Sequence, residues 1–245
     1  MEIYLSNIDQ ARFSRVIAKA KIDDSDDVDE LTVKANGMGA EMIMVRLPTT
    51  AVKSVQALER RGAILTDTLV YFQKKKINQY DTNLPNGYVA CAAQSSDANE
   101  VSCLAAESFK GYFGHYHADD RLNKSDCDDV YTSWAKNSCL KGTLADEVLL
   151  IKKHDEIAAF ATVKKIGENS FEGVLFGVGL KHQEKGLHLN LMQLSQNWGF
   201  DNNMGRMLTS TQITNVTVQK NWCRVGMEPL NSYYTFHLWL NHDSI

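Results

Sequence analysis

The spacing of apolar and polar positions predicts alternating strands and helices from Tyr88 to the C-terminus. Leu187, Leu191, Leu194 and Trp198 recur at helical spacing and predict a helix over 185–200. The nearly continuous apolar run 171–180 predicts a strand that is buried on both faces. The other predicted strands are 88–93, 147–153, 157–165, 207–211 and 233–240, and the other predicted helices are 97–109, 128–138 and 215–225. Hairpins mixed with strand–helix units predict an α/β fold.

A polar segment from Lys74 to Asn86 interrupts this pattern. It holds one of the three prolines and several turn-forming residues, which indicates a boundary between domains. We therefore expect a small N-terminal domain over residues 1–80 and a complete α/β domain over 88–245.

A weak internal repeat relates these two parts of the chain. Thr49–Gln73 aligns without gaps on Ile213–His237, and Gly62 then meets Gly226. Both copies predict a helix, a glycine turn and a strand. Chance similarity of two such units is the alternative to a duplication. If the repeat is real, the N-terminal domain is a degenerate half of the same fold, without a phosphate loop.

Composition and charge narrow the functional classes. The chain has 245 residues, of which 44% are hydrophobic and 23% charged, with a formal net charge of -4. That balance is ordinary for a globular protein and argues against nucleic acid as a partner. The start, Met1-Glu2-Ile3-Tyr4, does not have the pattern of a signal peptide, and no segment has the roughly 20 apolar residues of a membrane span. We expect a soluble, cytoplasmic protein with no membrane partner.

A metal site is not expected. The five cysteines are widely spaced without a Cys-x-x-Cys pair, which is typical neither of a disulfide framework nor of a zinc site. His115 and His117 also have no further ligands at a recognisable spacing.

The turn between the predicted strand 171–180 and the helix 185–200 carries the candidate chemistry. The first N–H groups of a helix have no intrahelical partner, so a helix start binds anions such as pyrophosphate. Gly186 allows a close approach because it has no Cβ. A local basic cluster surrounds the turn, namely Lys181, His182, Lys185 and His188. A solvated turn with exposed lysines is the alternative reading.

Two motifs here resemble the GNAT superfamily of N-acyltransferases. Gln183-x-x-Gly186 is similar to its acyl-CoA pyrophosphate loop, Gln/Arg-x-x-Gly-x-Gly/Ala, with His188 in place of a small residue. Asn215-x-x-Val218-x-x-x-Trp222-x-x-x-Gly226-Met227 is similar to the next element, in which Trp222 replaces a frequent Tyr. The resemblance implies a GNAT-like mixed sheet with helices on both faces and acyl-CoA as co-substrate, without a metal. The contacts it implies for acyl-CoA are Phe176, Val178, Gln183, Glu184, Lys185, Gly186, Leu187, His188, Asn215 and Trp222.

Further stretches resemble bacterial TDP-fucosamine N-acetyltransferases, which acylate the amine of a nucleotide-linked amino sugar. They are 113–121, 131–134, 211–215 and 234–239. The resemblance implies transfer of an acetyl or longer acyl group, such as hydroxybutanoyl, to a TDP-linked amino-dideoxy sugar for lipopolysaccharide or other surface polysaccharide. Asp119 would hold the amine or a hydroxyl, and Arg121 would pair with the pyrophosphate. The full set of expected acceptor contacts is Phe113, His115, Tyr116, His117, Asp119, Arg121, Tyr131, Trp134, Thr211 and Gln212.

The same resemblance implies direct transfer in a ternary complex. The thioester would lie in a V-shaped opening between the strands 171–180 and 207–211, with a backbone N–H near 176–178 polarising its carbonyl. The indole of Trp222 cannot serve as the general acid. The expected catalytic residues are Asn215, Tyr234 and His237, although the departing thiolate can itself collect the proton.

Two other readings stay open. The chain could be a GNAT enzyme that acts on another amine, such as a protein N-terminus or an antibiotic, or a non-catalytic acyl-CoA-binding module. The sequence also leaves open the acyl chain, the acceptor sugar and the oligomeric state, a homodimer among the alternatives.

Overall fold

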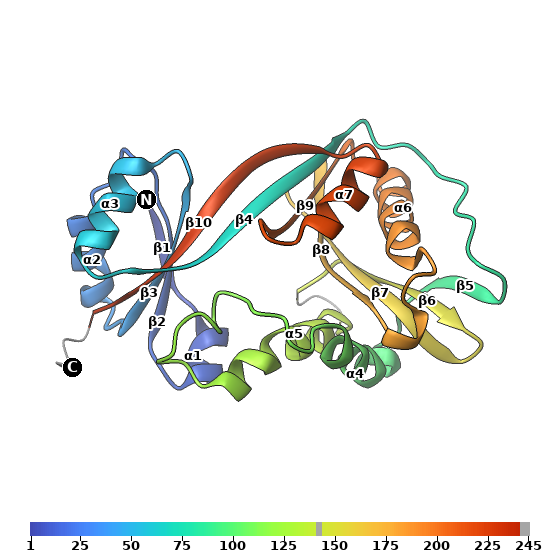
Figure 1. Ribbon diagram of the computed structural model, residues 1–245, viewed down its shortest axis with the longest axis horizontal. Helices are drawn as coiled ribbons and strands as arrows, with labels where there is room; N and C mark the ends of the chain where they lie inside the picture. The colour runs from blue at the N-terminus through green and yellow to red at the C-terminus, as the bar shows by residue number, and fades with distance from the viewer. Residues whose placement is uncertain (141–143, 241–245) are drawn as a thin grey trace. The chain divides into compact units, whose positions relative to one another are not determined.

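The computed structural model describes residues 1–140 and 144–240 and has mixed α/β structure (Figure 1). The chain divides into two compact units. The first contains Met1–Val70, Phe113–Cys127 and the C-terminal segment from Asn231, and the second contains Tyr71–Tyr112 and Asp128–Leu230.

This division differs from the linear one into residues 1–80 and 88–245. The reason is strand pairing, because β10 (Glu228–Trp239) pairs antiparallel with β3 (Met42–Pro48) from Tyr233↔Pro48 to Trp239↔Met42. The end of the chain therefore completes the first unit. The polar segment expected as a linker belongs to the second unit, where the backbone of Tyr80 exchanges hydrogen bonds of 2.7 and 2.9 Å with the side chain of Asn197.

The strands of the first unit follow the order β1-β2-β3-β10-β4, with β2 parallel to β3 and β1 antiparallel to β2. Alternation along β2, Ile-Ala-Lys-Ala-Lys, sends alanines to one face and lysines to the other. The alanine face forms an apolar core with Leu31 of α2 and Leu58 of α3, and Figure 1 shows these two helices together on one side of the strands. The elements are β1 (Glu2–Leu5), α1 (Asn7–Phe13), β2 (Ile17–Lys21), α2 (Val28–Gly37), β3 (Met42–Pro48), α3 (Val52–Arg60) and β4 (Ile64–Lys75).

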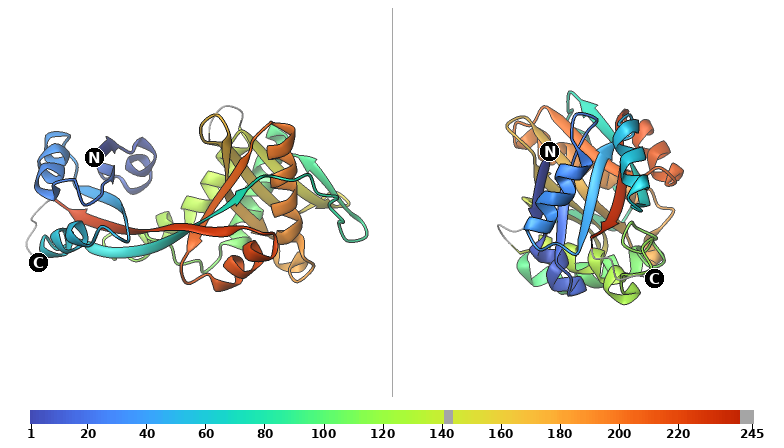
Figure 2. Two further views of the ribbon diagram at one scale, coloured as in Figure 1. Left: turned by 90° about the horizontal axis from the view of Figure 1, so that it is seen from above. Right: turned by 90° about the vertical axis from the view of Figure 1, so that its left-hand side faces the viewer.

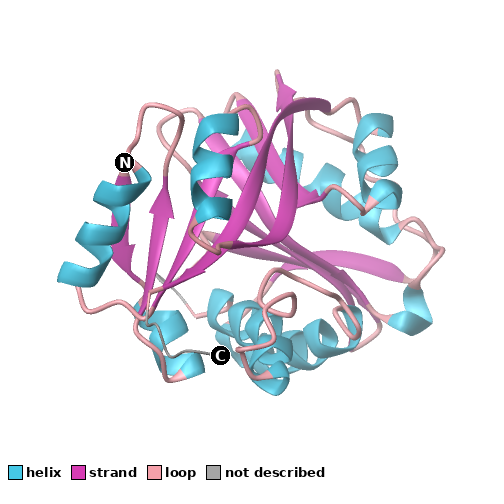
Figure 3. Ribbon diagram, turned by 60° about the vertical axis from the view of Figure 1, so that its left-hand side comes forward, coloured by secondary structure: helices cyan, strands magenta, loops and turns pink. Residues whose placement is uncertain are grey.

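The strands of the second unit follow the order β9-β8-β7-β6-β5, with β8 parallel to β9 and the other neighbours antiparallel. Helices α4 and α5 pack on one face of these strands, and α6 packs on the other (Figures 2 and 3). No helix within the described part of the chain is both long and apolar enough to cross a membrane. The elements are β5 (Tyr88–Ala92), α4 (Ala98–Ser108), α5 (Lys124–Ser138), β6 (Glu147–Lys153), β7 (Glu156–Lys165), β8 (Ser170–Val178), α6 (Leu187–Asp201), β9 (Arg206–Gln212) and α7 (Val216–Arg224).

The predicted α/β fold with helices on both faces of a mixed sheet is confirmed. From Tyr88 onward every predicted strand and helix is present, most of them within two residues of the predicted bounds. The largest differences are at α5, which begins at Lys124 instead of 128, and at β10, which begins at Glu228 instead of 233. Both elements begin with mainly polar residues, so apolar periodicity did not indicate where they start.

The expected internal repeat has a counterpart in the element bounds. A constant offset of 164 residues, as from Val52 to Val216, carries β3 onto β9, α3 onto α7 and β4 onto β10 at both ends of each element. The turn glycines obey the same offset, since Gly62 has φ +76° and Gly226 has φ +73°. In both units the first strand of this set is also paired in parallel with the strand before it in the sequence, β3 with β2 and β9 with β8. The agreement supports a duplication.

Candidate functional site

In the second unit, the parallel strands β8 and β9 are paired over only part of their length. The ladder runs from Ser170↔Arg206 to Gly173↔Thr209, and the Thr209 hydroxyl donates to the Gly173 carbonyl at 2.9 Å. β8 continues to Val178, but its last five residues form no ladder with the described residues of β9. The two strands therefore part in the manner expected for the opening between 171–180 and 207–211.

Two backbone amides of β8 face this unpaired side. The N–H of Gly179 donates to the Ala158 carbonyl of β7 at 3.0 Å. Successive amides of an extended strand point in opposite directions, so the N–H of Val178 points away from β7, as does that of Phe176 two residues earlier. The side chains of both residues pack against the apolar cluster under α6. Their backbones, and not their side chains, are thus placed to polarise a carbonyl.

The connection from β8 to α6 ends in a helix start without a side-chain cap. Gly186 occupies the N-cap position at φ +76°, and a Cβ built on it would meet no atom within 4 Å. The first intrahelical bond runs from the Asn190 N–H to the Gly186 carbonyl at 3.2 Å. The N–H groups of Leu187, His188 and Leu189 are the orphan donors of this helix end, and the open space at Gly186 lets an anion approach them.

In the basic cluster expected around this turn, the two lysines are exposed and the two histidines are largely buried. Lys181 is 81% exposed and lies 3.7 Å from Glu156, and the Lys185 ammonium donates to the Lys181 carbonyl at 2.6 Å. His182 is buried, with its Nδ1 2.9 Å from the Tyr88 hydroxyl. Burial lowers the pKa of His188 to about 4, so this imidazole is neutral near pH 7. Positive potential at the turn comes from the helix end and the lysines.

Helix α7 uses its motif residues for structure. The Asn215 side chain caps the helix by accepting from the Val218 N–H at 3.4 Å, and its amide donates to Thr211 Oγ1 at 3.1 Å. Trp222 is 2% exposed and packs edge-on against Phe72 at 5.3 Å between ring centroids. Asn215 and Trp222, both expected to contact the donor, therefore shape and support α7.

In the first unit, three of the predicted residues form one hydrogen-bonded chain. Asp119 is fully buried, and its Oδ2 lies 3.0 Å from Nδ1 of His237 and 2.7 Å from the indole nitrogen of Trp239. Nε2 of His237 lies 3.1 Å from Nδ1 of His115. His237 is also fully buried, whereas His115 is partly exposed.

The carboxylate at the end of this chain is held in its ionised form. Arg121 adds two hydrogen bonds to Oδ1 of Asp119, from its backbone N–H at 3.1 Å and from Nε at 3.2 Å. Burial raises the pKa of Asp119, but the hydrogen bonds from its donors outweigh burial and hold the pKa well below its usual range. The guanidinium of Arg121 also lies over the Trp239 ring, 4.8 Å from its centroid.

A second buried carboxylate lies close by in the first unit. Asp9 of α1 is 2.6 Å from the Lys19 ammonium and accepts from the Tyr116 hydroxyl at 2.8 Å. The Tyr116 and His115 rings are 3.8 Å apart between centroids, which links the two networks. Sequence reasoning missed Asp9 and Lys19, and it included Trp239 only in the stretch 234–239, without a role. The alternation of β2, which places Lys19 on a polar face, was the signal available for one of them.

The remaining residues predicted in this region do not join the hydrogen-bonded chain of Asp119, His237 and His115. Tyr234 lies three residues from His237 and on the opposite face of β10, packed against the apolar core of the first unit. Phe113 is 63% exposed, and the His117 Nδ1 accepts from the Gly114 N–H at 3.2 Å. Tyr234 and His237, expected together as catalytic candidates, are thus separated by the strand itself.

Four predicted acceptor residues belong to the second unit. Tyr131 stacks on Phe109 at 4.7 Å between centroids, and Trp134 packs with it against the cluster under α4 and α5. Thr211 accepts from the amide of the Asn215 cap, and the Gln212 carbonyl accepts from Gln219 at 3.3 Å. Tyr131 and Trp134 therefore serve the core, the structural alternative for residues at helical spacing.

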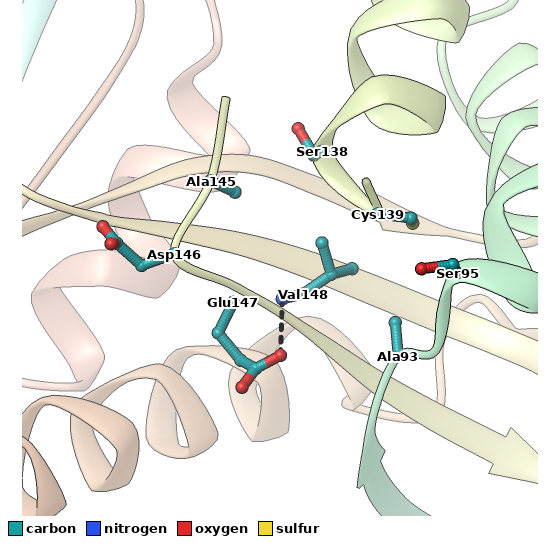
Figure 4. A pocket seen from close by; sticks show the side chains of 8 residues that line it. All are labelled: Ala93, Ser95, Ser138, Cys139, Ala145, Asp146, Glu147 and Val148. Atoms are coloured by element: carbon teal, nitrogen blue, oxygen red, sulfur yellow. Dashed lines mark hydrogen bonds between the residues drawn. The ribbon is translucent and has the colours of Figure 1, made fainter. Parts of the chain in front are cut away.

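A separate pocket lies at the start of β6, lined by Ala93, Ser138 and Cys139 among others (Figure 4). Burial raises the pKa of the Cys139 thiol to about 11, so it is protonated and a weak nucleophile. Within the described residues no three His, Cys, Asp or Glu side chains are grouped as metal ligands.

By sequence, no protein-family model and no curated protein matches this chain. Its fold does match solved structures. A GCN5-related N-acetyltransferase from Sphaerobacter thermophilus superposes with a TM-score of 0.64 and 11% identity, over 98% of this chain and 76% of that chain. A GCN5-related N-acetyltransferase from Kribbella flavida gives 0.61 and 14%, over 91% and 80%. A tandem GNAT protein from the clavulanic acid biosynthesis pathway gives 0.59 and 12%, over 88% and 69%. The chain therefore has the fold of the GCN5-related N-acetyltransferases.

Proposed function

We propose that this protein is an N-acyltransferase that uses acyl-CoA as its donor. The observation that carries the proposal is the helix start at Gly186, which has no side-chain cap and follows, after a short connection, a strand that parts from its parallel neighbour. The helix start offers N–H donors to a pyrophosphate, and the end of β8 offers backbone amides outside the β9 ladder to a thioester. The likeness to GCN5-related N-acetyltransferases supports reading the two features together.

The residues of the second unit fit such a donor. The amides of Leu187, His188 and Leu189 would donate to the pyrophosphate, with Lys181 and Lys185 adding positive charge. The N–H of Phe176 or Val178 would donate to the thioester carbonyl and stabilise the negative charge that develops there when an amine attacks. Collapse of the tetrahedral adduct forms the amide and releases the CoA thiolate.

The proton that the thiolate needs does not come from the α7 aromatic position. Trp222 is buried against Phe72, and an indole N–H does not titrate in the useful range. A thiolate with an ordinary pKa near 8.5 can be released without prior protonation. The thiolate therefore takes up a proton after it leaves, from the amine or from water.

We further propose a TDP-linked amino sugar as the acceptor, on the resemblance of 113–121 and 234–239 to TDP-fucosamine acetyltransferases. Arg121 supports this choice because its side chain is 46% exposed while it is held against Asp119, and a fixed guanidinium suits a diphosphate. A different amine acceptor and a non-catalytic acyl-CoA-binding module are the competing functions. Trp222, in place of a titratable tyrosine, favours the binding module.

Calorimetry with CoA, together with free-thiol release from acetyl-CoA over a panel of amines, separates these functions. We expect CoA binding, and thiol release that depends on a TDP-amino sugar. Thiol release that depends on another amine would show that the protein is an N-acyltransferase with a different acceptor. Tight CoA binding without release across the panel would indicate the binding module. Failure to bind CoA would overturn the donor site itself.

A further inference from the structure

A surface pocket of about 360 Å³ lies between the first two turns of α6 and the end of α7. Leu189 and Gln193 line it from α6, and Arg224 lines it as the last residue of α7. Figure 1 shows these two helices side by side. Lys74, near the end of β4, and Tyr80, in the polar segment that follows, also line the pocket. All of its lining residues belong to the second unit.

The ammonium group of Lys74 is fixed at one side of this pocket. It donates to the Val225 carbonyl at 3.2 Å, and a Cβ built on Gly226 would lie 2.6 Å from its Nζ. Lys74 therefore covers the carbonyl end of α7, where the helix dipole is negative, with a positive charge. Two N–H groups of the ammonium stay available, and Lys74 forms no ion pair within the described residues.

Arg224 supplies a second positive charge to the pocket. Its Nη1 donates to the side chain of Asn221 at 3.1 Å, and its guanidinium forms no ion pair with the part of the chain that the structure describes. Among the described residues that line the pocket there is no aspartate or glutamate. The nearest acid in sequence, Glu228, lies 2.8 Å from Lys75, which is on the face of β4 opposite to Lys74. Two positive charges therefore line this pocket without a neutralising carboxylate.

The pocket adjoins the helix start at Gly186. The backbone N–H of Leu189 is the last of the three orphan donors of α6, and Leu189 also lines the pocket, with 37% of its surface exposed. Gln193 lies one turn further along, about 6 Å along the axis of α6. A pyrophosphate on the helix start would therefore have this pocket beside it, on the side toward α7.

We propose that this pocket binds the 3′-phosphate of CoA through Lys74 and Arg224, with the adenine ring against Tyr80. The inference deepens the proposed function and rests on it. In CoA the 3′-phosphate and the adenine are attached to one ribose, and the pyrophosphate is attached to the same ribose. A CoA molecule whose pyrophosphate lies on the helix start therefore carries both groups close to the pocket. The two cations suit a phosphate dianion, and the Gln193 amide can exchange hydrogen bonds with the edge of the base.

The backbone of Tyr80 is held in place by α6. Its N–H donates to the side chain of Asn197 at 2.7 Å, and its carbonyl accepts from the same side chain at 2.9 Å. Further along the same polar segment, the Asn83 carbonyl accepts from the amide of Asn190 at 3.2 Å. The segment is thus tied to α6 at two points, and a wall that is already ordered lowers the entropic cost of binding.

Calorimetry with CoA and with dephospho-CoA, which lacks only the 3′-phosphate, tests the pocket. We expect dephospho-CoA to bind about 10- to 100-fold more weakly, because it lacks the charged hydrogen bonds of the phosphate. Lys74→Gln and Arg224→Gln should each weaken CoA binding about 10-fold and leave the affinity for dephospho-CoA unchanged. Because Arg224 is exposed, its variant tests the pocket without disturbing the core. Arg60→Gln, at the exposed last residue of α3 and hence at the repeat position of Arg224, is the matched control and should keep the full preference for CoA.

Tyr80→Ala tests the position of the base. We expect this variant to weaken CoA and dephospho-CoA by the same factor, about 3- to 10-fold, because both ligands carry the adenine ring. Unchanged affinities in the variant would overturn the contact between the adenine and Tyr80.

The other outcomes distinguish this pocket from the donor site. Equal affinities of CoA and dephospho-CoA in the unaltered protein would overturn the inference and leave the proposed function standing. A preference for CoA that survives in both Lys74→Gln and Arg224→Gln would do the same. We expect 3′,5′-ADP to compete with CoA, and binding through Lys74 and Arg224 without competition would assign the pocket to a free nucleotide instead. Absence of any CoA binding would overturn the proposed donor site, and this inference with it.

Discussion

The two strand-to-helix connections, Ile22–Asp27 before α2 and Gly179–Gly186 before α6, have the same topology and opposite electrostatics. Each leaves a strand that is parallel to the next one, β2 to β3 and β8 to β9. The first carries four aspartates in six residues, whereas the second has lysines at 181 and 185. Topology alone therefore does not make an anion site, because the side chains of the connection decide its charge.

Hydrogen bonding sharpens the contrast. Asp27 caps α2 by accepting from the Asp29 N–H at 2.8 Å, and Asp26 accepts from the Asp23 N–H at 3.0 Å and binds the N-terminal ammonium group at 2.7 Å. Hydrogen bonds from Ser25 lower the pKa of Asp23, which keeps that carboxyl charged. The α2 connection thus satisfies its own donors and repels anions. Gly186 leaves the donors of α6 available.

The largest expected effect comes from giving α6 the acidic start of α2. We expect Gly186→Asp to weaken CoA binding about 1000-fold, equivalent to ~4 kcal/mol, because a carboxylate would face the pyrophosphate and occupy its space. Calorimetry with CoA measures this change.

Gly62→Asp is the matched control for this variant. Gly62 has the same φ of +76° and the same open space for a Cβ, so both variants bear a similar backbone strain of about 1–2 kcal/mol. Thermal unfolding should show similar losses of stability in both, with CoA binding kept only in Gly62→Asp. Equal CoA affinities in the two variants would contradict the assignment of α6.

An intermediate effect concerns the second residue of each helix, Asp29 in α2 and His188 in α6. The pKa of His188 is about 4 in the folded protein and near 6.5 when unfolded, so the unfolded chain takes up its proton first as pH falls. The neutral His188 ring therefore contributes its full share to the free energy of unfolding above pH 6.5. This share decreases progressively as the pH falls from 6.5 to 4. We expect a loss of about 2 kcal/mol from pH 7.5 to 5, measured by urea unfolding.

His188→Gln should remove that share of the pH dependence, and His154→Asn should keep it. CoA affinity should stay constant from pH 7.5 to 6 in the unaltered protein, since His188 carries no charge over that range. An affinity that rises as pH falls, and no longer does so in His188→Gln, would show that His188 is a cationic ligand after all.

The smallest effect comes from removing the cap of α2. We expect Asp27→Ala to lower the free energy of unfolding by about 1 kcal/mol through the lost hydrogen bond to Asp29, with no change in CoA affinity. Glu30→Ala, on the exposed face of the same helix, should cost only a few tenths of a kcal/mol through its pair with Lys34. Tighter CoA binding by Asp27→Ala would contradict the conclusion that topology alone does not make an anion site, because the start of α2 would then bind CoA once its cap is removed.

Much of the fold followed from local pattern. The apolar stripe of Leu187 and Leu191 predicted α6, and the run 171–180 predicted β8, because burial of one helix face or of a central strand leaves its period in the sequence. The bounds of β10 and the membership of the first unit could not be predicted this way. The start of β10 is polar, and its partner β3 lies about 190 residues earlier, which periodicity does not encode.

The candidate sites show the same division between features that local sequence predicts and features that only packing decides. Gly186 and the turn around it could be predicted, because a glycine between a strand and a helix is a local signal. The neutral state of His188 and the burial of His182 could not, since both depend on what packs around the rings. Asp119, His115 and His237 were all candidates, but their order in a hydrogen-bonded chain came from the structure.

The sequence by itself determined the strands and helices of the larger part of the chain, the turn at Gly186 and the acidic start of α2, because each depends on residues a few positions apart. Tertiary structure decided which strands pair, which histidines are neutral and which side chains meet. His237 reaches Asp119 across 118 positions because β10 pairs with β3. Pairing and burial depend on the whole fold, and they turn a list of polar residues into two chemically distinct sites.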